Sequence, residues 1–243
     1  MKNTIFFTHI PKTSGSSFKK YLIEPNFNER EIYMPRGRLD ILTKLNKSKI
    51  KVVQGHIKFG VHHFIDNKPI YITFLRDPIQ RAISHYFFVK QCKFSTYIHP
   101  DFSLVESFSI DEFFKLKFRD NLQTRFIAGY GYDKEIKNSD KLLAKAIENL
   151  DKYYQVIGIK EKFEESLYCF KKYFNWKLSM SHEYQEQKTM FKKQIKDIDD
   201  DVIYSITQSH ELDIQLYNFA VKKFESQLIN QRNLFEYQDY KYE

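Results

Sequence analysis

The sequence predicts an α/β fold in which helices flank a central, mainly parallel sheet. Short runs of β-branched and aromatic residues alternate along the chain with longer segments whose apolar residues recur at helical intervals. The runs at 51–55 and 69–75 are almost continuously apolar, which is typical of parallel strands covered on both faces. Because strand–helix–strand connections pair their strands in parallel, we expect one layered sheet.

Each element follows from this alternation. Strands are expected at residues 4–8, 51–55, 69–75 and 154–158. Helices are expected at residues 18–23, 79–89, 109–128, 141–150, 163–174 and 199–224. Asp77 is a favourable N-cap for the second helix, because proline follows it at the first helical position. No repeat, low-complexity tract or linker divides the chain, so we expect a single domain over residues 1–243.

The composition points to a globular protein with an anionic partner. Lys and Arg number 39 against 31 Asp and Glu, which gives a formal charge of +8. No RNP-like aromatic motif or helix-turn-helix pattern accompanies this charge, so a nucleic-acid partner is not expected. Cys92 and Cys169 have no metal-binding spacing, so we expect two buried thiols and no metal site.

The N-terminal segment predicts a location for the protein. Its apolar run stops after residue 8, which is too short for the core of a signal peptide, and no stretch approaches the ~20 apolar residues of a membrane span. We therefore expect a cytoplasmic, bacterial protein without a membrane span.

A hydroxyl-rich loop with one lysine separates the first strand from the first helix. Gly15 allows backbone N–H groups to approach an anion, and Lys12 supplies a positive charge. Further donors come from Thr13, Ser14, Ser16 and Ser17. The loop is not a Walker A loop, because its lysine precedes the glycine. It predicts a phosphate-binding site, with an ordinary serine-capped turn as the alternative.

A second candidate site follows the strand at 69–75. Arg76 leaves the carboxyl end of this strand, and Ser84 lies two helical turns further on. A guanidinium and a hydroxyl on one face suit a phosphate monoester. The alternative is a local salt bridge of Arg76 with Asp77 and an ordinary surface serine.

Together the two segments resemble the donor-binding motifs of sulfotransferases. Residues 10–18 resemble their 5′-phosphosulfate loop, and residues 75–84 resemble their 3′-phosphate motif, in the branch that includes heparan sulfate 2-O-sulfotransferase. Further similar segments follow in the same order at 54–60, 121–125, 156–158, 163–167 and 212–220. The resemblance therefore covers nearly the whole chain.

The resemblance implies a P-loop-kinase-like sulfotransferase fold and a sulfuryl donor, 3′-phosphoadenosine 5′-phosphosulfate (PAPS), which leaves as adenosine 3′,5′-bisphosphate (PAP). By this resemblance Lys12, Thr13, Ser14, Gly15, Ser16 and Ser17 hold the 5′-phosphosulfate, and Arg76 with Ser84 holds the 3′-phosphate. The acceptor is expected to be a carbohydrate hydroxyl, and transfer needs no metal. The expectation of a carbohydrate acceptor rests only on the branch of the family that the sequence resembles.

The same resemblance places the catalytic base at His56, since a Gly-His pair after a short strand supplies it in related enzymes. A neutral imidazole can take the proton of an attacking alcohol, while Lys12 offsets the charge on the leaving phosphate. His62 and His63 compete with His56 for this role. His85 is expected to be structural or to line the acceptor site.

Some alternatives remain open at the level of sequence. Arg125 could meet an acidic acceptor or the donor, or be a surface charge on a helix. The protein could also be a nucleotide-dependent phosphotransferase on the same fold, or a non-catalytic protein that binds an anionic glycan or a nucleotide. The oligomeric state is not indicated.

Overall fold

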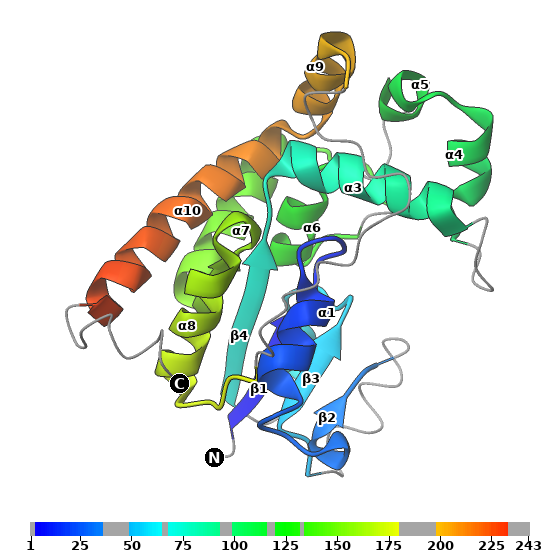
Figure 1. Cartoon of the computed structure of the whole chain (residues 1–243). Coiled ribbons are helices and arrows are strands. Elements are labelled where there is room, and N and C mark those ends of the chain that lie inside the picture. The colour runs from blue at the N-terminus through cyan, green and yellow to red at the C-terminus, as the bar shows by residue number, and fades with distance from the viewer. Residues whose placement is uncertain are drawn as a thin grey trace.

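The computed structural model describes residues 3–35, 49–64, 68–92, 99–115, 120–131, 134–179 and 198–232. Their strands form a five-stranded sheet in the order β2-β3-β1-β4-β5, with every pairing parallel (Figure 1). The strands are β1 (Asn3–Thr8), β2 (Ile32–Tyr33), β3 (Val52–Gly55), β4 (Lys68–Leu75) and β5 (Tyr154–Ile159). The predicted α/β fold with a parallel sheet is confirmed. Strand β2 has only two residues, too few for a periodic pattern in the sequence.

Helices surround this sheet. They are α1 (Gly15–Phe18), α3 (Pro78–Gln91), α4 (Phe102–Ser107), α5 (Ile110–Lys115), α6 (Leu122–Ala128), α7 (Ser139–Lys152), α8 (Phe163–Phe174), α9 (Asp200–Ser209) and α10 (Glu211–Arg232). Shorter helical segments are η1 (Lys19–Ile23), η2 (Glu29–Glu31), η4 (Val61–Phe64) and η6 (Lys160–Lys162). In Figure 1, α3 crosses above the carboxyl end of β4, and the long α10 runs down beside α7 and α8.

The core forms on both faces of the sheet because side chains alternate along each strand. Phe7 contacts Phe18 of α1 on one face, with ring centroids 4.8 Å apart, and Phe18 contacts Phe170 of α8 at 4.7 Å. On the other face Phe6 stacks on Tyr71 at 5.1 Å. Burial on both faces explains why the strands read as continuous apolar runs.

A second apolar cluster lies on α3 away from the sheet. Tyr86 and Phe87 of α3 pack there with Val105 of α4, Phe113 of α5 and Val202 of α9. Figure 1 shows these helices grouped at one end of the molecule, beyond the carboxyl ends of the strands. This cluster therefore holds α3 in place above the edge where the strands end.

The expectation of one helix over 109–128 is wrong, because α5 ends at Lys115 and α6 starts at Leu122. Asn121 has a left-handed backbone with φ of 48°, which breaks a right-handed helix. Its side chain donates to the Ser209 carbonyl at 3.1 Å and accepts from the Asp213 N–H at 3.1 Å. These distant contacts fix the break, and the local apolar pattern does not reveal them.

Candidate functional site

The carboxyl ends of β1, β3 and β4 define the site. The chain leaves β1 towards β2 and β3 on one side of the sheet and leaves β4 towards β5 on the other. In a parallel α/β sheet, ligands bind where successive connections diverge in this way. The crevice beyond β1 and β4 is therefore the expected binding position. The loop at 9–14 and residues 76–77 flank it.

The loop after β1 is tightly wound. Lys12 and Ser14 both have left-handed backbones with φ of 70°. The buried Thr13 hydroxyl donates to the Ile10 carbonyl at 2.9 Å, which closes the turn. Ser16 is exposed and Ser17 is partly exposed at the start of α1. An internal hydrogen bond thus holds the conformation of the loop, and its serine side chains are accessible to solvent.

The Lys12 side chain points from this loop to α3. Its ammonium nitrogen lies 4.4 Å from the centre of the Phe88 ring. Burial and the nearby Arg76 charge lower the pKa of Lys12 to about 8, and Cys92 acts in the opposite direction. Lys12 is therefore a desolvated cation that is still charged at neutral pH.

Arg76 follows β4 directly and reaches the same loop. Its Nη1 donates to the Lys12 carbonyl at 3.2 Å, and its Nε lies 3.9 Å from a Glu161 carboxylate oxygen. The second Glu161 oxygen accepts a hydrogen bond from Tyr217 at 2.8 Å. The local salt bridge considered for Arg76 thus involves Glu161, while the Asp77 carboxylate caps α3 by accepting from the Gln80 N–H at 2.8 Å.

Gln123 of α6 holds the backbone of Arg76, a role that the sequence did not reveal. Its amide oxygen accepts from the Arg76 N–H at 3.0 Å, and its amide nitrogen donates to the Arg76 carbonyl at 2.8 Å. Gln123 is fully buried. A side chain that satisfies both backbone groups fixes where β4 ends, and so where the guanidinium begins.

Ser84 lies on the face of α3 that is turned to the loop. Residues 84, 88 and 92 are spaced by four, so they share one helix face. Phe88 on this face lies beneath the Lys12 ammonium. Ser84 is partly exposed, and the Arg76 guanidinium donates to the Lys12 carbonyl. The structure thus places Ser84 one turn from the Lys12 contact.

His56 comes directly after β3 and is exposed. Its Nδ1 lies 2.7 Å from the His9 carbonyl oxygen. A carbonyl only accepts, so Nδ1 carries the proton, and in the neutral imidazole Nε2 is then unprotonated. This tautomer presents a proton acceptor at the same edge as Lys12 and Arg76.

His9 joins the β1 loop to the β3 end, and it was not predicted as a site residue. Its N–H donates to the Gly55 carbonyl at 3.0 Å, and its ring lies 4.8 Å from the His56 ring. Burial, His56 and Lys12 lower the pKa of His9 to about 3. The ring occupies the space beside Gly15, where an added Cβ would lie 2.0 Å from the ring carbon Cδ2. The His9 ring is thus uncharged and packs between the β1 loop and the end of β3. The sequence pattern alone does not distinguish such a residue from an ordinary loop histidine.

His62 and His63 are placed differently. The His62 Nδ1 lies 2.9 Å from the Tyr71 hydroxyl, and its ring packs against Tyr153. Burial lowers the pKa of His62 to about 4, and the His63 ring packs at a tilt against the same ring. Both histidines belong to an aromatic cluster beside β4, whereas His56 contacts the β1 loop.

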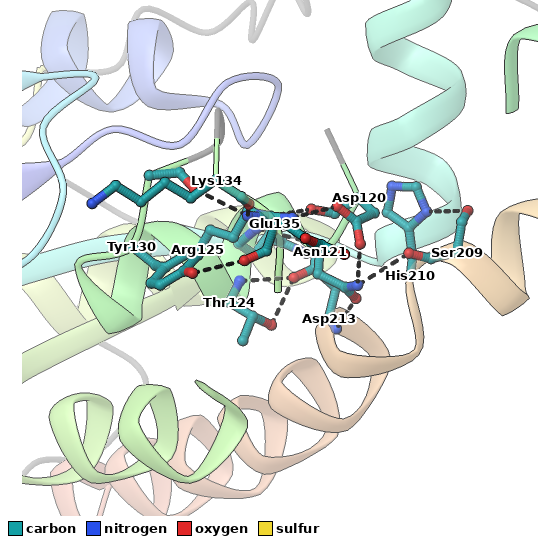
Figure 2. A network of polar contacts seen from close by, with 12 residues as sticks. Asp120, Asn121, Thr124, Arg125, Tyr130, Lys134, Glu135, Ser209, His210 and Asp213 are labelled. Atoms are coloured by element: carbon teal, nitrogen blue, oxygen red, sulfur yellow. Dashed lines mark hydrogen bonds and ion pairs between the residues drawn. The ribbon is translucent and has the colours of Figure 1, made fainter. Parts of the chain in front are cut away.

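Arg125 is buried, and internal acceptors surround its guanidinium (Figure 2). Its Nη2 pairs with the Asp120 carboxylate at 2.6 Å, and its Nη1 donates to the carbonyls of Gly131 and Lys134. The interpretation of Arg125 as a surface charge is wrong, and internal acceptors occupy the guanidinium considered for a ligand contact. Arg125 therefore stabilises the segment that follows α6 by binding its backbone carbonyls.

A desolvated lysine, an arginine and an exposed histidine lie at the carboxyl edge of the parallel sheet, in an α/β fold consistent with that of a sulfotransferase. The model of the galactose-3-O-sulfotransferase family matches residues 22–231, and the chain belongs to this family. It is therefore a carbohydrate sulfotransferase. No match is found among curated proteins.

The extent of the match refines the sequence expectations. It includes His56, Arg76 and Ser84 but begins after the Lys12 loop. A carbohydrate sulfotransferase family was expected and is confirmed, whereas the family model does not describe the heparan sulfate 2-O branch.

The expectation of a cytoplasmic bacterial protein is wrong. In eukaryotes the family members are type II membrane enzymes of the Golgi lumen. The expectation rested on missing apolar segments, and a missing segment carries no physical information about the compartment. Across the described ranges, none of the helices has the length and apolarity to cross a bilayer.

Proposed function

We propose that this chain transfers a sulfuryl group from PAPS to a carbohydrate hydroxyl, with His56 as the general base. The hydrogen bond from the His56 Nδ1 to the His9 carbonyl carries this proposal, because it leaves Nε2 as the proton acceptor. The exposed position of His56 allows an acceptor to reach it.

The donor site is proposed at the β1 loop and α3. Lys12 and the hydroxyls and N–H groups of residues 13–17 would hold the 5′-phosphosulfate, and Arg76 with Ser84 would hold the 3′-phosphate. The contact of the Arg76 guanidinium with the Lys12 carbonyl supports a single pocket, since it joins the two motifs. Both cations are largely desolvated, which strengthens their attraction to phosphate.

The proposed reaction is an in-line displacement. The His56 Nε2 takes the proton of the acceptor hydroxyl while the hydroxyl oxygen forms a bond to sulfur. The bond from sulfur to the 5′-phosphate oxygen breaks, and PAP leaves with the negative charge. The Lys12 ammonium offsets this charge, so the step needs no metal ion.

The acceptor is proposed to be the 3-hydroxyl of a galactose residue. The family that includes residues 22–231 is named for this position. The sequence resemblance to the branch that includes heparan sulfate 2-O-sulfotransferase instead suggests a hydroxyl of a heparan-type glycan.

Transfer of radiolabelled sulfate from PAPS to a β-galactoside and to a de-O-sulfated heparan oligosaccharide tests the proposal. We expect labelling of the galactoside at O3, to be located by NMR. Labelling of the heparan acceptor alone would reject the galactose assignment. Phosphoryl transfer from ATP without sulfuryl transfer would reject the sulfotransferase assignment.

The variant His56→Ala tests the base. We expect it to bind PAP as the native protein does but to lose about 10²–10⁴-fold in turnover, the usual contribution of a general base. His63→Ala is the matched control, because His63 is an exposed histidine of the aromatic cluster. Unchanged turnover in His56→Ala would remove His56 from the mechanism.

A further inference from the structure

A compact cluster of metal-ligand side chains joins α3 to α4. His85 comes from α3, and His99 and Asp101 immediately precede α4. Their side chains are 12%, 13% and 4% exposed. One ligand atom from each lies within 4.8 Å of the other two. We call these three residues the α3–α4 cluster.

The distances in the α3–α4 cluster are longer than those of strong hydrogen bonds, although His85 and Asp101 still interact as a weak hydrogen-bonded pair. The Asp101 Oδ2 lies 3.5 Å from the His85 Nε2 and 3.6 Å from the His99 Nδ1. Charge-assisted hydrogen bonds between such groups are about 2.7–2.9 Å long. Ligands about 2.0–2.1 Å from a tetrahedral zinc ion are roughly 3.3 Å apart. The two distances are therefore closer to ligand separations around a metal ion.

The His99 Nδ1 is already an acceptor in the α3–α4 cluster, where a metal ion would have to displace the backbone N–H that now occupies its lone pair. The Nδ1 accepts from the Asp101 N–H at 3.1 Å, so this nitrogen is unprotonated. An unprotonated imidazole nitrogen is the form that binds a metal. Two imidazoles with one carboxylate suit zinc and related divalent transition metals.

We propose that the α3–α4 cluster binds one divalent transition-metal ion of the zinc class, with water as a further ligand. The ion would fasten the start of α4 to the middle of α3. It would also steady Phe88, whose ring packs edge-on against His99 at 6.1 Å and lies beneath Lys12. The role is structural and separate from the sulfuryl transfer, so either proposal can fail without the other.

Cobalt substitution tests this site. Untagged protein is freed of metal with a chelator and titrated with Co²⁺, and the visible absorption and the metal content are measured. We expect one Co²⁺ per chain with the absorption of a tetrahedral nitrogen and oxygen site, displaced by an equivalent of Zn²⁺. Asp101→Asn and His99→Ala should each weaken Co²⁺ binding by tenfold or more, and His63→Ala should not.

The result that would overturn the proposal is folded protein that takes up no stoichiometric Co²⁺. A thiolate-to-cobalt charge-transfer band would also overturn it, because the ion would then lie on Cys92 or Cys169. Equal binding by the native protein and both variants would mean that surface histidines hold the ion. Circular dichroism of each variant separates loss of ligand from loss of fold, and Asp101→Asn conserves the side-chain shape.

Discussion

At the residue scale, the lowered pKa of Lys12 predicts that ligand binding at the proposed donor site depends on pH. The ammonium sits in a low-dielectric position over Phe88 and close to Arg76, and its charge is lost as the pH rises through about 8. An ordinary exposed lysine keeps its charge well beyond this range. A ligand bound by this charge should therefore dissociate more readily in mildly alkaline solution.

We predict that PAP affinity falls between pH 7 and 9, approaching about tenfold per pH unit above the pKa of the free lysine. Isothermal titration calorimetry at constant ionic strength measures this. Lys12→Arg keeps its charge over the whole range and should give a flat profile. A native profile as flat as that of Lys12→Arg would show that Lys12 does not hold the bound phosphate.

Gly15 and His9 depend on each other. An added methyl at position 15 would overlap the His9 ring, with a contact of 2.0 Å to its Cδ2. We predict that Gly15→Ala lowers the free energy of unfolding by about 1–3 kcal/mol, the usual cost of overpacking. Denaturant unfolding measures the loss.

Adding His9→Ala to Gly15→Ala should restore part of this stability, because the smaller side chain makes room for the methyl. The two changes would then be strongly non-additive in a double-mutant cycle. Additive losses would show that the close approach of position 15 to His9 is not what limits the loop.

At the scale of elements, α10 determines where α6 begins. The Asp213 carboxylate of α10 accepts from the N–H groups of Gln123 and Thr124 at 3.1 and 2.7 Å and from the Thr124 hydroxyl at 2.8 Å. Figure 2 shows this carboxylate facing the start of α6. Asp213 is fully buried and also attracts the buried Arg81 guanidinium. Gln123 in turn holds the backbone of Arg76. Asp213 therefore helps to position Arg76 in the candidate site through a single residue, Gln123.

We predict that Asp213→Asn destabilises the fold by about 3–5 kcal/mol, because it removes the carboxylate that compensates a buried cation. It should also weaken PAP binding, through a displaced Gln123 and Arg76. Chemical unfolding and calorimetry measure the two effects. Asp140→Asn, at the exposed start of α7, is the control. It should change neither the free energy of unfolding nor the free energy of PAP binding by more than about 0.5–1 kcal/mol. A native-like Asp213→Asn would show that the cap is dispensable.

At the scale of the whole molecule, buried neutral histidines make the fold sensitive to acid. His210 lies between α9 and α10, with its Nε2 3.2 Å from the Arg81 Nη2 and its Nδ1 facing the Ser209 hydroxyl and the Ile206 carbonyl. Burial lowers the pKa of His210 to about 3, and the charges of Arg81 and His85 add to this. The unfolded chain binds more protons than the folded chain between about pH 3 and 6.5, so stability falls as the pH falls through this window.

We predict that His210 alone accounts for about 2 kcal/mol of lost stability between pH 7.5 and pH 5, from the difference between its folded and unfolded pKa values. Urea unfolding at the two pH values measures the loss. His210→Asn should be less stable at pH 7.5 but should show a smaller difference between the two pH values. An unchanged difference would show that His210 does not titrate on unfolding.

The sequence by itself determined the α/β class, four of the five strands, the two segments that we propose hold the donor, and the position of His56 after β3. These depend on local information: apolar runs mark strands covered on both faces, and a Ser-Gly loop or an Arg after a strand is visible in order along the chain. The tertiary structure decided what depends on contacts between distant residues. It placed the Lys12 ammonium over the Phe88 ring and bound the Arg76 backbone to the Gln123 side chain. It also fixed the His56 tautomer through the His9 carbonyl and buried Arg125 among internal acceptors. Such contacts are set by how helices and strands pack, and the same residues in another packing would have other partners.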